Sequence, residues 1–303
     1  MANDNEIRDK VITHRVFLEY QKNRIVNESL KNFKNYLPDF KDFVKYLIAN
    51  DITKLNPELE KELLLIIQSV FKDFKDTAVE QQILLGQYES AFQSRLIDSV
   101  VKDNVIKRPI SKSLMRTLIF QDYIINNKKQ NLNGVIINQS LDMNSLLKRN
   151  INKGLAEGIG RVGVTNSLLG VINLKQNQLD TLVRTNINNA VTMTNVATFE
   201  ERADFVKKLK WSSILDVRTT DICRRNNGRI VTIEESKGLL PAHWNCRAFW
   251  IPVLNKDILL PDQYSDWKKT QSPNIFLNSK KDDRFEISKS DTMTLKQQEQ
   301  LEN

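Results

Sequence analysis

The sequence predicts an α+β protein, in which a long and mostly helical N-terminal region precedes a small α+β module with a short antiparallel sheet. Two observations lead to this prediction. Apolar residues recur every three or four positions through residues 1–150, which is the spacing of amphipathic helices. After residue 206 that spacing gives way to short β-rich runs separated by turn residues.

Residues 1–150 are predicted to form a helical arm or scaffold throughout. The buried face is marked by runs such as Leu59, Leu63, Ile67 and Val70. The region shows no cluster of reactive side chains. His14 stands alone on an amphipathic helix, where a surface or half-buried histidine is the ordinary interpretation.

Five of the nine glycines lie between Gly154 and Gly170. A dinucleotide-binding loop would need a strand before such glycines, but the preceding residues favour a helix. We therefore expect a pair of short helices joined by a turn. Residues 174–205 follow as a strongly helical stretch.

Three strands are predicted for the C-terminal third. The first covers residues 211–215, the second covers residues 229–233 after an Asn-Asn-Gly turn, and the third starts at Ala248 and is expected to end at Pro252. Residues 257–303 are polar, and we expect an extended or partly disordered tail there.

Positive charge is concentrated in one part of this chain of 303 residues. Residues 206–256 contain ten Lys or Arg residues and four Asp or Glu residues, within an overall net charge of +8. This excess is typical of contact with nucleic acid or another polyanion, although a solvated basic surface is the plainer interpretation. No apolar run approaches the roughly 20 residues of a membrane span, so none is expected.

Both cysteines and one of the two histidines fall within residues 215–247. Cys223, His243 and Cys246 are chemically suitable zinc ligands, and Asp216 or Asp221 is a candidate for the fourth. However, neither cysteine belongs to a CxxC pair, which would be the stronger zinc signature. The ligand count therefore favours no cofactor, with zinc as the alternative.

Two other interpretations of this segment stay open. In the first, the residues are structural: His243 binds the backbone of the loop after Asp216, and Arg247 pairs with the Asp216 carboxylate, so that two loops are locked together. In the second, the segment is catalytic: His243 activates a cysteine, or acts with Arg218 or Arg247 on a phosphodiester as in a nuclease or transferase. The residues favour the structural interpretation over an enzyme.

A register of residues in this segment resembles the C-terminal region of the phage Mu protein F-like family, whose members are minor head or head morphogenesis proteins of tailed bacteriophages. The likeness covers roughly residues 145–255, and its most specific part is the closing PAHWNCR. The matching positions are Arg184, Thr185, Trp211, Asp216, Arg218, Thr219, Cys223, Gly228, Pro241, His243, Asn245, Cys246 and Arg247.

The resemblance implies a module at residues 151–256, helical over 151–205 and β-containing over 206–256. It further implies a virion protein of the phage head that is present in the host cytoplasm during assembly. The implied partners are the portal, the major capsid protein or both, and also DNA. Two departures weaken a zinc site: Ala248 stands where members often have a cysteine, and residues 220–222 lack a second one.

Overall fold

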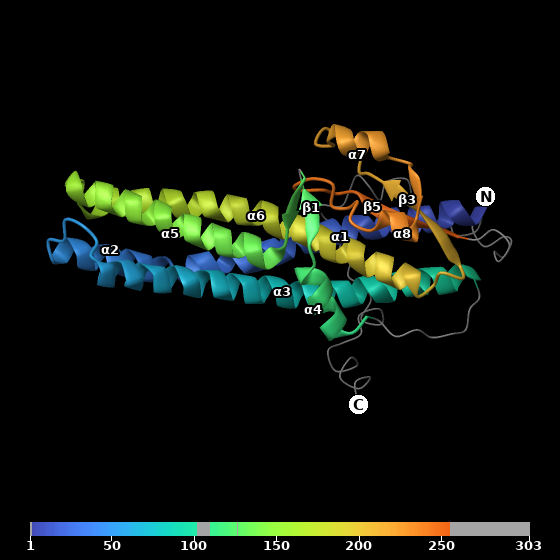
Figure 1. Cartoon of the computed structure of the whole chain (residues 1–303), viewed down its shortest axis with the longest axis horizontal. Coiled ribbons are helices and arrows are strands. Elements are labelled where there is room, and N and C mark those ends of the chain that lie inside the picture. Colours follow the sequence, from blue (N-terminus) through green and yellow to red (C-terminus); the bar gives the residue numbers. More distant parts are fainter. Residues whose placement is uncertain (1, 102–109, 126, 255–303) are drawn as a thin grey trace, which may run out of the picture.

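A computed structural model describes residues 2–101, 110–125 and 127–254 of the chain. Long helices run side by side and give the molecule an elongated shape (Figure 1). They pack through one continuous apolar core that extends from Leu18 in the first helix to Val191 in the last. The helices of this bundle are α1 (Ala2–Asn35), α2 (Leu37–Ala49), α3 (Pro57–Val101), α5 (Leu132–Ala156) and α6 (Gly160–Glu200).

The connection between α3 and α5 departs from the predicted helical pattern. It contains the short helix α4 (Lys112–Phe120) and an antiparallel hairpin of β1 (Tyr123–Ile125) and β2 (Lys128–Gln130). The prediction that residues 1–150 are helical throughout is therefore wrong here. The β-rich triplet Tyr123–Ile125 is too short for a periodicity to show in the sequence, and its burial alternates as in a strand.

The turn predicted among the glycines is present, but the helices on either side are long. Helix α5 ends at Ala156, and α6 begins at Gly160 and continues for 41 residues. Gly158 and Gly160 have φ of +65° and +67°, a conformation that favours glycine and permits the tight reversal. The boundary expected at residue 150 consequently lies inside α5, which packs along α6.

A three-stranded antiparallel sheet follows the bundle, in the order β4-β3-β5. Its strands are β3 (Val206–Ser212), β4 (Ile230–Thr232) and β5 (Phe249–Leu254). The short helices α7 (Asp221–Asn226) and α8 (Ile233–Ser236) lie between them in the sequence. The first strand thus begins five residues earlier than predicted. The last continues through Pro252 to Leu254, because β5 is an edge strand of this sheet, where a missing N–H is tolerated.

The sheet has its own apolar core, which the bundle helps to complete. Trp211 and Trp250 meet edge to face across β3 and β5, with ring centroids 5.5 Å apart. Val11 of α1 and Ile97 of α3 join the same cluster, so the bundle forms the base on which the sheet rests. The architecture confirms the predicted α+β fold class with a helical N-terminal region and a short antiparallel sheet.

Two further expectations concern the ends of the chain and membranes. The tail expected at residues 257–303 lies outside the described residues. Within the described ranges, no helix is both long and apolar enough to cross a membrane.

Candidate metal centre and polar cleft

The loop from β3 to α7 is shaped by its own side chains. The Asp216 carboxylate accepts the backbone N–H of Arg218 at 2.8 Å, and the Thr219 hydroxyl donates to the carbonyl of Ile214 at 2.6 Å. The same hydroxyl accepts the N–H of Asp216 at 2.8 Å. These local bonds explain the Asp-x-Arg-Thr spacing, since each residue satisfies a backbone group of the turn. The turn leads into α7, where Cys223 is buried.

The second loop is fixed against helix α6. Asn245 has a φ of +58°, and its backbone N–H donates to the Thr185 hydroxyl at 2.9 Å. Thr185 is itself fully buried in α6. The backbone N–H of Cys246 donates to the carbonyl of His243 at 3.2 Å. This tight turn brings the side chains of His243 and Cys246 to the same place. The bond from Asn245 to Thr185 explains why a threonine of α6 belongs to the motif.

The structure brings three predicted metal ligands together. The Cys223 sulfur lies 3.1 Å from Nε2 of His243 and 3.9 Å from the Cys246 sulfur. All three ligand atoms lie within 4.8 Å of one another. With zinc–sulfur bonds of about 2.3 Å, two thiolates of a tetrahedral site are about 3.8 Å apart. The sulfur–sulfur separation fits that value, and the sulfur–nitrogen pair needs to open by only a few tenths of an ångström.

Hydrogen bonds around the trio favour a charged sulfur and a fixed imidazole. Nδ1 of His243 lies 2.7 Å from the carbonyl of Trp244 and donates to it, which directs Nε2 at the sulfurs. Contacts with Cys223 and His243 lower the pKa of the Cys246 thiol well below its usual range, despite burial. The neighbouring Cys246 sulfur in turn raises the pKa of the Cys223 thiol.

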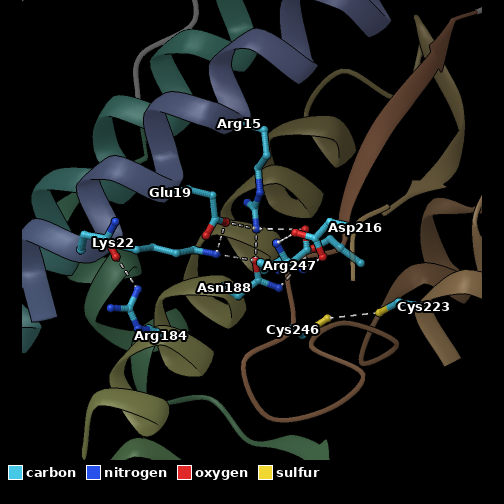
Figure 2. Close-up of polar contacts among 11 residues, drawn as sticks. Arg15, Glu19, Lys22, Arg184, Asn188, Asp216, Cys223, Cys246 and Arg247 are labelled. Carbon is cyan, nitrogen blue, oxygen red and sulfur yellow. Dashed lines mark hydrogen bonds and ion pairs between the residues drawn. The ribbon is translucent and has the colours of Figure 1, made fainter. Parts of the chain in front are cut away.

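Asp216, the fourth candidate ligand, has a different partner. Its two carboxylate oxygens accept from Nη1 and Nη2 of Arg247 at 2.7 and 2.5 Å (Figure 2). These bonds hold the pKa of the carboxyl well below its usual range. Asp216 is therefore not part of the metal-ligand group, and the Arg247 pair joins the two loops as the structural interpretation expects. His243 makes its backbone bond within its own loop, to Trp244, and not to the loop after Asp216.

A cavity of about 10 Å³ adjoins two of the three ligands, Cys223 and His243, and is also lined by Thr220. That volume is about the size needed for one water molecule. A metal held by three protein atoms would thus have space for a solvent molecule as its fourth ligand. The Thr220 side chain also forms a hydrogen bond with Cys223.

The remaining motif residues support this site from different elements. Trp211 donates from its indole nitrogen to the Ser213 hydroxyl at 2.9 Å. Gly228 has a φ of +88°, and its N–H donates to the carbonyl of Trp211 at 2.8 Å in the turn before β4. Pro241 is buried at the start of the second loop. Arg218 is 75% exposed, so it takes part in the turn through its backbone more than through its side chain.

Helix α1 adds buried charged residues that the sequence did not reveal. Arg15 and Lys22 are almost fully buried. Both approach Glu19, which also lies on α1, and Asn188 of α6 (Figure 2). Arg15 also donates to the carbonyl of Arg247 at 3.5 Å. Charges spaced three or four apart are the pattern of a solvated helix face, so nothing in the sequence separates them from ordinary surface residues. They line or adjoin a polar cleft next to the metal-ligand group.

The geometry does not favour the nuclease or transferase interpretation, in which His243 acts with Arg218 or Arg247 on a phosphodiester. Both ring nitrogens of His243 already have partners, one on the Trp244 carbonyl and one at the sulfurs. Arg247 is bound to Asp216 through both terminal nitrogens. A general base needs a free nitrogen within hydrogen-bond reach of its substrate, and His243 does not offer one in this arrangement.

Comparison with known proteins agrees with the motif. Residues 146–251 match the family model described as "Phage Mu protein F like protein". This segment is similar to the Mu F-like family. The match covers about a third of the chain, including α6, both loops and most of the sheet. No curated protein and no solved structure matches the chain.

Proposed function

We propose that this chain is a minor head protein of a tailed bacteriophage, which acts in head morphogenesis beside the portal and contacts DNA. The Mu F-like match over residues 146–251 carries the coarser part, a head morphogenesis protein of a phage. The geometry supports a structural role, because the motif residues hold two loops to each other and to α6. The protein is then assembled in the host cytoplasm and retained in the virion head.

The head role is tested by composition and by deletion. Purified heads should contain the chain, and it should copurify with the portal or the major capsid protein after mild dissociation. Particles assembled without it should show fewer complete heads. Normal heads that assemble and package DNA in its absence would overturn the proposal.

The proposed DNA contact rests on a cationic surface of the sheet module. Five exposed cations lie on β3, on α7 and in the turn before β4. They are Lys207, Lys208, Arg224, Arg225 and Arg229. Phosphate contacts of this kind release counterions, so binding should weaken steeply as salt rises.

A charge-matched pair of variants tests this surface. Replacing Arg225 and Arg229 by Gln should lower DNA affinity and reduce the slope of log affinity against log salt by about 2. Replacing Lys41 and Lys45 by Gln removes the same charge from exposed positions of α2 and should change neither. Equal effects of the two double variants would show that only net charge matters and would remove the contact surface.

We also propose that Cys223, His243 and Cys246 hold a zinc ion with a structural role. The sulfur–sulfur separation of 3.9 Å, the oriented imidazole and the adjoining small cavity support it. Elemental analysis should find one zinc per chain, and Cys246→Ser should lose it. Cobalt substitution should give thiolate-to-metal absorption. A metal-free protein with the same stability, or a Cys223–Cys246 disulfide, would contradict the site.

A further inference from the structure

A polar cleft of about 590 Å³ lies between α1, α6 and the two motif loops. His243 and Cys246 of the metal-ligand group form part of its wall, and the rest of the lining is rich in charged side chains. Four cationic side chains line it, from Lys22, Arg184, Arg218 and Arg247, against two carboxylates, from Glu19 and Asp180. These cations come from two helices and two loops, so the fold gathers positive charge here from distant parts of the sequence.

Lys22 in the wall of the cleft and Arg15 behind it together carry more buried positive charge than the Glu19 carboxylate can balance. Arg15 and Lys22 are each only 2% exposed, and both pair with the single carboxylate of Glu19. Burial and the nearby Arg15 lower the pKa of Lys22 to about 8. Nε and Nη1 of Arg15 are buried and have no hydrogen-bond partner among the described residues. Buried charge without full compensation is costly, and a bound anion would offset that cost.

The outer wall retains unused hydrogen-bond donors. Arg184 binds Asp180 through Nε and Nη2, at 2.7 and 3.1 Å, and Asn23 through Nη1 at 2.6 Å. Arg218 is the freest cation, since its side chain is 75% exposed and its nearest carboxylate, Asp216, is 3.6 Å away. The four cations that line the cleft face the carboxylates of Glu19 and Asp180, and Asp216 binds one of them, Arg247, which leaves one cation without a carboxylate.

We propose that this cleft binds a phosphate group, carried by a nucleotide or by a nucleic-acid backbone. A planar carboxylate is satisfied by one guanidinium, as Asp216 already is by Arg247. A tetrahedral phosphate offers acceptor oxygens in several directions, which suits Lys22 and Arg218 approaching from α1 and from the first motif loop. The volume exceeds that of a single phosphate and leaves space for the group attached to it.

The inference does not depend on the proposed head role, because it is tested on the purified chain. Titration calorimetry with pyrophosphate should give saturable binding to one site per chain. A nucleoside monophosphate and a short single-stranded oligonucleotide are the two further ligands, and the tighter of them identifies the source of the phosphate. Acetate and a glutamate-rich peptide serve as carboxylate ligands and should bind at least tenfold more weakly.

Matched variants locate the binding. Arg218→Gln removes the exposed cation with little cost to folding and should weaken pyrophosphate binding about tenfold or more. Arg229→Gln removes another exposed arginine, which lies outside the cleft, and should leave affinity unchanged. Lys22→Met should abolish pyrophosphate binding. If that variant does not fold, the comparison of Arg218→Gln with Arg229→Gln is sufficient to test the proposal.

Two results would overturn the proposal. One is equal affinity of the Arg218→Gln and Arg229→Gln proteins for pyrophosphate. The other is tighter binding of the glutamate-rich peptide than of any phosphate ligand, which would identify the cleft as a docking site for an acidic protein segment. Neither result would bear on whether the chain is a head protein.

Discussion

The two histidines of this chain are placed in opposite surroundings. His14, in the bundle, has its Nε2 2.6 Å from Glu89, and its ring stacks on Phe92 with centroids 3.5 Å apart. His243, in the sheet module, faces two sulfurs beside a cavity of about 10 Å³. Both side chains are held by hydrogen bonds, but only His243 adjoins donor atoms and space for a further ligand.

This contrast shows that burial of a polar group is not by itself a sign of function. The carboxylate of Glu89 also accepts from Gln93 at 2.8 Å, so the bundle pair is satisfied by protein atoms alone. The sulfurs of Cys223 and Cys246 instead contact each other and one imidazole, which are all potential metal ligands, besides neighbouring hydroxyl and backbone groups. We therefore expect the bundle to depend on its own pairs and the module to depend on a bound ion.

The largest effect is expected from breaking the bundle pair. Glu89→Ala leaves the buried His14 and Gln93 without their partner and should reduce the free energy of unfolding by about 3–5 kcal/mol. Urea titration followed by circular dichroism measures it. Glu80→Ala, at an exposed position of the same helix, should cost less than about 0.5 kcal/mol. Similar losses of unfolding free energy in the two variants would mean that the buried His14–Glu89 pair stabilises the bundle no more than an exposed residue does.

Metal removal should give the next largest effect. Zinc present at about a thousand times its dissociation constant would stabilise the fold by about 4 kcal/mol. A chelator should therefore lower the unfolding temperature seen by tryptophan fluorescence, since Trp211 and Trp250 lie in the sheet core. The Cys246→Ser protein should not respond to the chelator. Unchanged wild-type unfolding after chelation would show that the module, like the bundle, is complete without an ion.

A smaller effect should follow from cutting the link between the two regions. Thr185→Val removes the acceptor of the Asn245 backbone N–H and should cost about 1–2 kcal/mol. It should also loosen the second loop and weaken metal retention. Thr117→Val, an exposed change in α4, is the control for the shape of the substitution. If Thr185→Val leaves metal content and stability at the control level, the loop does not need α6 to hold its turn.

The smallest effect concerns the Asp216–Arg247 pair, which is partly open to solvent. Because Arg247 lowers the pKa of Asp216 in the folded state, the pair stabilises the protein fully above the unfolded pKa of about 3.9. That contribution should be lost as pH falls below this value towards the folded pKa. Urea midpoints between pH 6 and 3 should fall more for wild type than for Asp216→Asn. Parallel curves for the two proteins would contradict the assignment.

The sequence predicted the site better than its surroundings, for physical reasons. The Asp-x-Arg-Thr turn and the His-x-x-Cys turn are local, so their spacing was visible in the chain. Arg15 and Lys22 reach the site from more than 150 residues away, and their helix spacing is that of any solvated face. The β1–β2 hairpin escaped prediction because strands of three residues leave no periodicity. The strand was wrongly expected to end at Pro252, because the position of β5 at the edge of the sheet depends on the pairing of strands and does not show in the local sequence.

The uninterrupted course of α6 has a mechanical consequence. Arg184 and Thr185 at the site lie 24 and 25 residues beyond Gly160, so about 36 Å of continuous helix separates them from the glycine turn. A rod of that length tilted by about 5° moves its far end by about 3 Å. The glycine turn at the tip of the bundle is thus joined to Thr185, the acceptor of the Asn245 N–H, by one uninterrupted helix. Helix α6 therefore connects the far end of the bundle directly to the loop that carries His243 and Cys246.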